Sequence, residues 1–235
     1  FYFKYRYKTT FKEDSHSLLN ILDKKHLDVF KRLIESLDGR QAVIPLSGGY
    51  DSRLIAVMLK RLNYDNILCF TYGREGNKDS ETSKKVARDL ELPWIFVEYT
   101  PETWKGWLEN ENTKEFIKYS SNMSSLPCIQ DLNAVEILKE KKLIKKDSII
   151  IPGHSYDFLQ GSHLPSSIKK YREFSYKDIR KTIIQKHYNL WGNNAKATTE
   201  IFDHKFLKSP FNLPHKLTPR QFAELFERWD LQERQ

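Results

Sequence analysis

Hydrophobic positions along the chain follow two spacings, and their order predicts an α/β fold. Short unbroken apolar runs at residues 42–46, 67–72, 93–99 and 148–151 are typical of buried strands. Between the first three runs, apolar residues recur every three or four positions, as in amphipathic helices. An order of strand, helix, strand, helix, strand predicts a doubly wound parallel sheet with right-handed crossovers.

Helices are also predicted before and after this core. The first seven residues alternate aromatic and basic side chains, which predicts a strand and suggests a fragment of a longer protein. Ser15 or Ser17 is the expected cap of the first helix, and Asp38-Gly39 its expected end. The predicted helices span residues 15–38, from the first strand to about residue 62, from Asp79 or Ser80 to residue 90, 101–146 with a break at Pro127, 176–190 and 219–232.

The first buried strand ends at a glycine turn that leads directly into a helix. Residues 47–52 have the sequence Ser-Gly-Gly-Tyr-Asp-Ser. Such a turn lies at the carboxyl edge of a parallel sheet, where ligands bind. Gly48 and Gly49 permit close backbone approach, and the amide groups of a helix N-terminus attract anions. Ser47 and Ser52 add hydroxyl donors, so the turn predicts a phosphate site.

Asp51 changes this interpretation, because a carboxylate repels phosphate unless a cation lies between them. Mg²⁺ is the ion that binds one or two carboxylates together with phosphate oxygens. No Gly-Lys-Ser/Thr follows the glycines, so the turn is not a Walker A loop. The alternative is a plain glycine turn that Asp51 or Ser52 caps.

The fourth predicted strand also ends at a polar loop with glycine, which contains Gly153, His154 and Asp157. Asp51 and Asp157 each follow a strand and a glycine, so both are expected at the same sheet edge. Two such carboxylates could share one Mg²⁺ ion. His154 is a candidate general base or phosphate partner, although a surface histidine without a role fits equally well.

Composition narrows the class of protein. The 235 residues are 39% hydrophobic and 30% charged, without an apolar run long enough for a membrane span or a signal peptide. Two cysteines make no disulfide framework, so the reducing cytoplasm is the expected location. The net charge of +8 suits nucleic acid or an anionic substrate such as ATP. Because the basic residues are scattered, nucleic acid is not the expected partner.

The motif at residues 47–52 resembles the PP-loop of the ATP pyrophosphatases. The wider sequence, over about residues 25–165, is similar to the synthetase domain of the asparagine synthase family. The resemblance implies an adenine nucleotide alpha hydrolase-like fold, ATP as ligand, and Mg²⁺ between Asp51 and Asp157. The residues that it assigns to ATP are Leu46, Ser47, Gly48, Gly49, Asp51, Ser52, Phe70, Thr71, Tyr72 and Gly153.

The resemblance also implies a reaction. The family adenylates a carboxylate or similar oxyanion, releases AMP and pyrophosphate, and passes the activated group to an amine. Asp51, Asp157 and His154 would be the catalytic residues, with a small-molecule acceptor and a glutaminase domain or subunit as ammonia source. Where the family has Ser-Gly-Glu-Gly-x-Asp-Glu followed by glycine, this chain matches at Gly153, Asp157 and Gly161 but departs at Pro152, His154 and Phe158.

The expected domains are residues 1–14 as a strand or linker from a preceding domain, 15–165 as the ATP-binding domain, and 166–235 as a helical, incomplete C-terminal extension. His154 puts the asparagine-forming substrate pair in doubt. Two alternatives therefore stay open. One is a PP-loop enzyme that modifies tRNA, and the other is a catalytically degenerate relative that acts as a scaffold.

Overall fold

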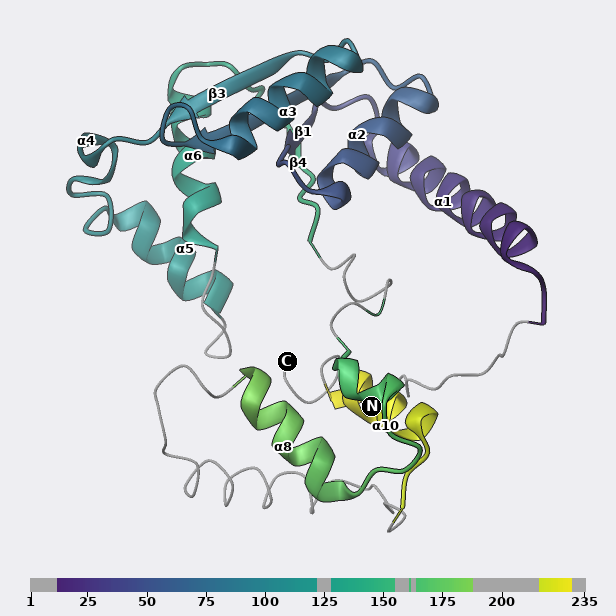
Figure 1. Cartoon of the computed structure of the whole chain (residues 1–235). Helices are drawn as coiled ribbons and strands as arrows, with labels where there is room; N and C mark the ends of the chain where they lie inside the picture. The colour runs from purple at the N-terminus through teal and green to yellow at the C-terminus, as the bar shows by residue number, and fades with distance from the viewer. Residues whose placement is uncertain (1–11, 122–127, 155–160, 162–163, 188–215, 230–235) are drawn as a thin grey trace. The chain divides into compact units, whose positions relative to one another are not determined.

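The structure, a computed structural model, describes residues 12–121, 128–154, 161, 164–187 and 216–229. These residues divide into two compact units, one within residues 11–156 and one within residues 157–235. The elements, drawn in Figure 1, are α1 (Ser15–Leu37), β1 (Ala42–Pro45), α2 (Tyr50–Arg61), β2 (Ile67–Gly73), α3 (Lys78–Asp89), β3 (Trp94–Glu98), α4 (Pro101–Trp104), α5 (Glu111–Ser121), α6 (Ile129–Glu140), β4 (Ile149–Ile150), η1 (Ser166–Lys169), α8 (Tyr176–His187) and α10 (Pro219–Arg228).

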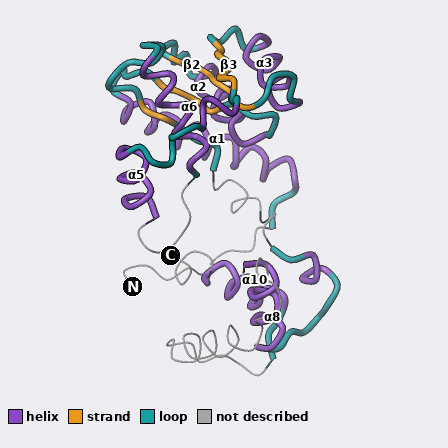
Figure 2. Tube along the Cα trace, turned by 90° about the vertical axis from the view of Figure 1, so that its left-hand side faces the viewer, coloured by secondary structure: helices purple, strands orange, loops and turns teal. Residues whose placement is uncertain are grey.

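The first unit is built on a parallel sheet with the strand order β3-β2-β1-β4. Ala42 of β1 pairs with Ile67 of β2 on one side and with Ile149 of β4 on the other. The chain therefore proceeds outward from β1 to β3 and then returns to the opposite side of β1. The strands, orange in Figure 2, lie among helices. The predicted α/β class with a parallel sheet is confirmed.

Helices cover both faces of this sheet, because its strands alternate their apolar side chains between two cores. Ala42 and Ile44 of β1 face the core that α1, α2 and α3 share. Val43, between them, faces the opposite core together with Phe70 of β2 and Leu138 of α6. The sheet is thus doubly wound, and the first core holds the helix that follows the glycine turn.

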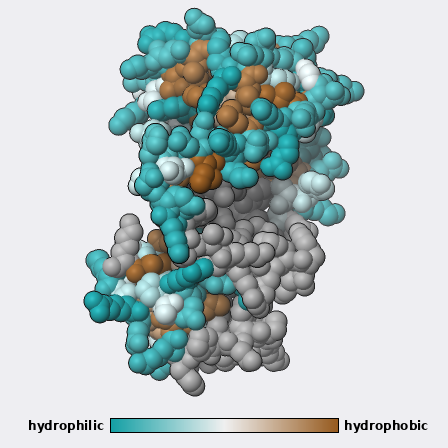
Figure 3. Space-filling view, turned by 90° about the vertical axis from the view of Figure 1, so that its right-hand side faces the viewer, coloured by the Kyte–Doolittle hydropathy of each residue, from teal (hydrophilic) through white to brown (hydrophobic). Residues whose placement is uncertain are grey.

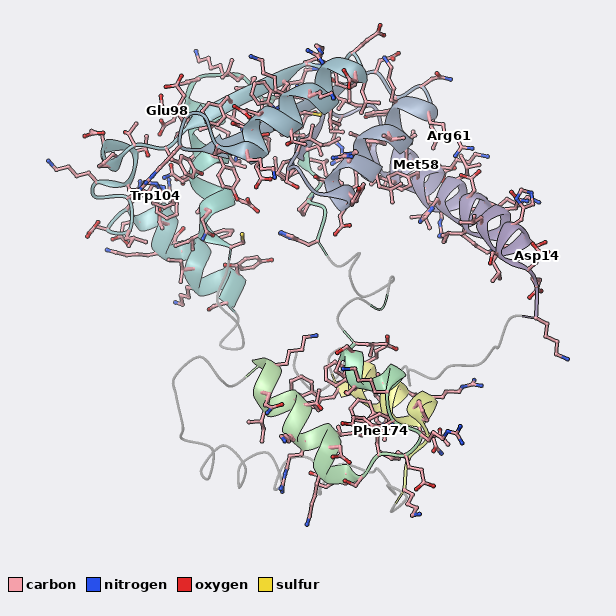
Figure 4. All side chains as sticks on the ribbon, in the orientation of Figure 1. Asp14, Met58, Arg61, Glu98, Trp104 and Phe174 are labelled. Atoms are coloured by element: carbon pink, nitrogen blue, oxygen red, sulfur yellow. The ribbon has the colours of Figure 1, made fainter. Side chains whose placement is uncertain are left out.

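Helix α1 is continuous, and its two halves differ in burial. Only Phe30 and Leu37, both in the second half, are buried. Arg61 of α2 donates two hydrogen bonds to Asp23 of α1, at 2.5 and 2.9 Å; Figure 4 labels Arg61, beside α1, and Asp14 at the helix start. The face in Figure 3, on the side where α1 lies, carries hydrophobic residues in brown among polar ones. Large apolar side chains exposed on α1 are Leu19, Ile21, Leu22 and Val29.

Several predicted element boundaries are wrong. Asp14, not Ser15 or Ser17, caps α1 by accepting the backbone N–H groups of His16 and Ser17. The predicted end at Asp38-Gly39 is confirmed, because both residues take the left-handed conformation after Leu37, with φ of 49° and 74°. Asn77 caps α3 in place of Asp79 or Ser80, because its side chain accepts from the N–H of Ser80.

The predicted helical stretch 101–146 is three separate helices, α4, α5 and α6. The fourth strand is only two residues long, since β4 pairs only at Ile149 and Ile150. The predicted strand over the first seven residues lies outside the described part of the chain. Among the described residues, no helix combines the length and the apolar character that a membrane crossing needs.

The second unit has a core of its own. Phe174, Ile179 and Ile183 pack with Phe222 and Phe226 of α10. Thr218 and Gln221 form a reciprocal capping box at the start of α10. The predicted C-terminal helix is therefore present, with its apolar side buried inside this unit.

Candidate functional site

A pocket of about 270 Å³ lies where the carboxyl ends of β1 and β2 meet the loop after β4. This is the point at which the strand order reverses, between β1 and β4, and open α/β sheets bind ligands there. Every described residue that lines it belongs to the first unit. The lining residues are Pro45, Leu46, Ser47, Gly49, Asp51, Ser52, Phe70, Thr71, Tyr72, Asp79, Asp131, Pro152, Gly153 and His154.

The glycine turn folds back on the first turn of α2 through the two serines of the motif. The backbone N–H of Ser47 donates to Ser52 Oγ at 3.0 Å, and the two hydroxyl oxygens lie 3.1 Å apart. The N–H of Gly49 donates to Ser47 Oγ at 3.2 Å. Ser52 is buried, so these contacts fix the turn at the positive end of the helix.

An acidic side chain occupies one donor of this turn. The N–H of Gly48 donates to Asp79 Oδ1, from the first turn of α3, at 3.2 Å. A Cβ atom at position 48 would lie 2.6 Å from that oxygen, so only glycine permits this approach. The carboxylate of Asp79 stands where the oxygen of a bound anion would stand. An acidic oxygen of the protein itself thus accepts from this turn, as the donors at a helix N-terminus favour.

Gly153 brings the loop after β4 into contact with the glycine turn. A Cβ atom at this position would lie 2.6 Å from the backbone nitrogen of Ser52 and 3.1 Å from the carbonyl carbon of Asp51. These are backbone atoms at the start of α2, which cannot move aside without disturbing the helix. The two loops that the sequence pairs, one after β1 and one after β4, thus meet at Asp51 and Ser52.

Of the three predicted catalytic residues, the structure describes Asp51 and His154 but not Asp157. Asp51 is half-buried and lines the pocket, and His154 lines it from the exposed side of the second loop. Asp157 lies outside the described residues, so its approach to Asp51 stays a prediction. Leu46, the last apolar residue before the turn, is buried, and its N–H donates to the carbonyl of Phe70 at 2.8 Å.

The three residues predicted to meet adenine have different roles. The ring of Phe70 is fully buried in the core beneath the sheet. The hydroxyl of Thr71 is engaged by Leu46, Ser83 and Trp94. Since the carbonyl of Phe70 faces β1, the strand alternation directs the backbone groups of Tyr72 to that same side, beyond the end of β1. Backbone contacts at Tyr72 therefore remain available to a ligand.

Tyr72 also connects the pocket to α6, a connection that the sequence analysis missed. Its hydroxyl donates to Asp131 Oδ1 at 2.5 Å. Burial, and then this acidic partner, raise the pKa of Tyr72 well above its usual value. Asp131 lies in the first turn of a helix far along the chain, and no motif surrounds it. Asp79 could have been found, because it opens the helix that follows β2 at the ligand edge.

Part of this chain matches the model of a known protein family. The model of the asparagine synthase family matches residues 37–107. The tRNA-specific 2-thiouridylase MnmA of Wolbachia sp. subsp. Brugia malayi is 26% identical over 128 residues, which cover 48% of this chain and 34% of that protein. The chain thus spans about a third of the length of this curated relative.

Two solved structures show weaker likeness. NH₃-dependent NAD synthetase from Campylobacter jejuni, in complex with nitrate, is 15% identical with a TM-score of 0.38, over 83% of this chain and 96% of that one. A predicted subunit of tRNA methyltransferase from Methanocaldococcus jannaschii is 16% identical with a TM-score of 0.31, over 71% of this chain and 75% of that one. The predicted resemblance to the asparagine synthase family is confirmed over residues 37–107, the segment that carries the PP-loop and the strands on either side of it.

Proposed function

We propose that this chain carries the ATP-binding synthetase segment of an amide-forming ligase of the asparagine synthase type. The family match and the thiouridylase relative support an ATP-using enzyme with a PP-loop. The observation that carries the proposal is the close contact of Gly153 with the backbone of Asp51 and Ser52. Because of this contact, the glycine turn and the loop after β4 would form one binding site at the switch point of the sheet.

The residues of the glycine turn would hold the phosphates of ATP. The hydroxyls of Ser47 and Ser52, with the N–H groups of Gly48 and Gly49, are donors at the positive end of α2. Asp79 now accepts from Gly48, so its carboxylate would leave this N–H when a phosphate oxygen takes its place. The backbone of Tyr72 is the expected contact of the adenine ring.

Asp51 fits a hard cation beside this turn. It is a half-buried carboxylate on the pocket wall, and its neighbours in the turn are donors suited to phosphate oxygens. A Mg²⁺ ion held by Asp51 would neutralise phosphate charge, which favours departure of pyrophosphate. We propose Asp157 as the second carboxylate ligand.

The proposed reaction transfers the adenylyl group of ATP to an oxygen of a small-molecule acceptor, with release of pyrophosphate. An amine, or ammonia from a glutaminase domain or subunit, then displaces AMP and forms the amide. Within this chain, catalysis would consist mainly of positioning and charge neutralisation by the turn. His154, which lines the pocket and follows Gly153 in the chain, is the proposed general base toward the amine.

The test begins with calorimetric titration of MgATP and then follows α-³²P-ATP with candidate acceptors. Wild-type protein should bind MgATP and form labelled AMP, and Asp51→Asn should weaken binding about tenfold or more, as removal of a charged partner from a phosphate site does. The exposed Asp28→Asn on α1 is the control for a lost negative charge. Labelled ADP as the product would overturn the mechanism. No MgATP binding by the wild-type chain would favour a degenerate scaffold.

A second candidate function, modification of tRNA, has a specific observation in its favour. The thiouridylase relative covers 48% of this chain, and the chain has a net charge of +8. Binding of tRNA that weakens steeply between low and moderate salt would favour this candidate, because phosphate contacts release counterions. Affinity for tRNA no greater than that for other RNA of equal length would count against it.

A further inference from the structure

Three side chains with metal-binding atoms meet on the α6 side of the pocket. The Sγ of Cys128, a carboxylate oxygen of Asp131 and a ring nitrogen of His154 all lie within 4.8 Å of one another. Cys128 is the N-cap of α6 and Asp131 lies one turn later, so both point to the same side of the helix. His154 reaches them from the loop after β4. We propose that Cys128, Asp131 and His154 bind a thiophilic divalent ion of the Zn²⁺ class.

The donor atoms select the class of ion. Thiolate and imidazole are ligands of Zn²⁺ and similar transition metals, whereas Mg²⁺ and Ca²⁺ take oxygen ligands. This site therefore differs from the proposed Mg²⁺ position at Asp51, and the inference does not depend on ATP binding. With the ion bound, the lone pair of the His154 ring would be taken, so His154 would then be a ligand and not the proposed base. Ligand atoms around tetrahedral zinc lie about 3.3–3.8 Å apart, given bond lengths near 2.0–2.3 Å. The side chains of Cys128 and His154 are exposed, and the Cys128 thiol donates to Gln130 Oε1 at 3.6 Å, a contact that binding of the ion would replace.

A fixed wall behind the cluster orients its carboxylate. The hydroxyl of Tyr72 donates to Asp131 Oδ1 at 2.5 Å. The ring of Tyr72 stacks on that of Tyr99 with 5.1 Å between centroids, and the hydroxyl of Tyr99 donates to the carbonyl of Gln130. Both tyrosines thus hold the first turn of α6 in place. Hydrogen bonds of this kind, from outside the ligand set, orient metal-binding carboxylates in known sites.

Three protein ligands leave one position of a tetrahedral ion open. Asp131 and His154 line the pocket, so the open position would face it. Catalytic zinc sites have this arrangement of three protein ligands and one water or substrate. The ion would therefore bind a polar group of a pocket ligand directly.

The chain offers a clean reporter for the test, because Cys69 and Cys128 are its only cysteines. Cys69 is fully buried in the sheet core, and burial raises the pKa of its thiol to about 12, so it should not react with alkylating agents in the folded protein. Cys128 is exposed. Alkylation of the native protein should therefore label Cys128 alone, and Zn²⁺ should protect it.

The experiment titrates the full chain with Zn²⁺ and with Co²⁺, without nucleotide. We expect one bound ion, a thiolate-to-cobalt charge-transfer band, and alkylation of Cys128 slowed about tenfold or more. Cys128→Ser should abolish the band, and His154→Ala and Asp131→Asn should weaken binding at least about tenfold, a loss that even indirect partners of metal ligands can cause. His16→Ala, an exposed histidine on α1, is the matched control.

The inference fails if Zn²⁺ leaves the alkylation rate of Cys128 unchanged. It also fails if Cys128→Ser and His154→Ala bind Zn²⁺ as tightly as the wild type, because the ion would then be bound elsewhere. Binding of MgATP is measured in a separate experiment. A failure of the Zn²⁺ proposal would therefore leave the proposed ATP site standing, and the reverse also holds.

Discussion

The hydroxyl of Thr71 is committed to structure although it lines the pocket. It donates to the carbonyl of Leu46 at 2.6 Å, lies 2.6 Å from Ser83 Oγ, and accepts from Trp94 Nε1 at 3.1 Å. These contacts join β1, α3 and β3 around the end of β2. Sequence reasoning placed Thr71 at the carboxyl edge of the sheet, where it lines the pocket, but it could not show that its side chain was already engaged.

We expect Thr71→Val to destabilise the protein by about 1–3 kcal/mol, because three polar partners lose a hydrogen bond in a buried place. Thr71→Ser keeps the hydroxyl and loses one methyl group, so it should cost about 1 kcal/mol or less. Urea denaturation of the two variants and the wild type measures this difference. Equal stability of the valine and serine variants would contradict the assigned role of the hydroxyl.

Gly153 and Gly49 line the same pocket but differ in what an added methyl group would meet. At Gly153 the Cβ atom would meet backbone at 2.6 Å, whereas at Gly49 it would meet only the end of the Ser47 side chain, at 3.3 Å. We expect Gly153→Ala to cost about 1–3 kcal/mol by overpacking. Gly49→Ala should stay within about 0.5 kcal/mol of the wild type, as exposed substitutions do.

Both glycine variants should bind pyrophosphate more weakly, for different reasons. In Gly153→Ala the second loop is displaced from the turn, and in Gly49→Ala the new methyl group enters the space of the phosphate. Thermal unfolding and calorimetry on the same samples separate the two effects. A stable Gly153→Ala protein with normal affinity would contradict the contact between the loops.

At the scale of single elements, the two halves of α1 differ, because only the second half has buried residues. Leu37 near its end is 1% exposed and packs into the sheet core, whereas Leu19 in its first half is 63% exposed. The sequence shows apolar residues at helical spacing in both halves. Spacing alone could not tell which half of α1 is covered, because that depends on which part of α1 packs against α2 and the sheet.

We expect Leu37→Ala to destabilise the protein by about 2–5 kcal/mol, the range for a buried leucine. Leu19→Ala removes the same atoms from an exposed position and should change stability by less than about 0.5 kcal/mol. Chemical denaturation gives both values. A large cost for Leu19→Ala would mean that another part of the protein covers this end of α1.

The errors in the predicted elements have physical causes of the same kind. Asn77 caps α3 because its side chain reaches the N–H of Ser80. Asp79 and Ser80, two and three residues later, are residue types with a similar preference for the cap position, so the sequence could not decide between them. The helical stretch predicted over residues 101–146 is three helices in the structure. The prediction missed these breaks because the apolar spacing continues across them. By contrast, the strands were predictable, since each buried run is short and ends at glycine or a turn.

At the scale of the molecule, most of the fold of the first unit followed from the order of strands and helices. Of the pocket, the PP-loop side followed from the motif. The α6 side did not, because Cys128 and Asp131 reach the pocket only through the packing of α6 on the sheet. The sequence of the second unit contains no recognisable motif. Among its described elements, only α8 and α10 were predictable from apolar spacing.

We expect the two units to respond separately to core mutations, since each has its own hydrophobic cluster. Phe222 is fully buried in the second unit, and Phe222→Ala should cost about 3–5 kcal/mol there. Pyrophosphate affinity, measured at a temperature where the first unit stays folded, should remain within about twofold of the wild type. Leu59→Ala, on the buried face of α2, is the control that should lower both the stability of the first unit and its affinity for pyrophosphate.

The strand order has a consequence for synthesis on the ribosome. Ala42 finds its partner Ile67 early, but its other partner, Ile149, is made only after more than half of the unit has emerged. Until then β1 is an open edge that other chains could join. We expect nascent chains that stop before β4 to aggregate, and nucleotide to protect the chain only once Gly153 has left the tunnel.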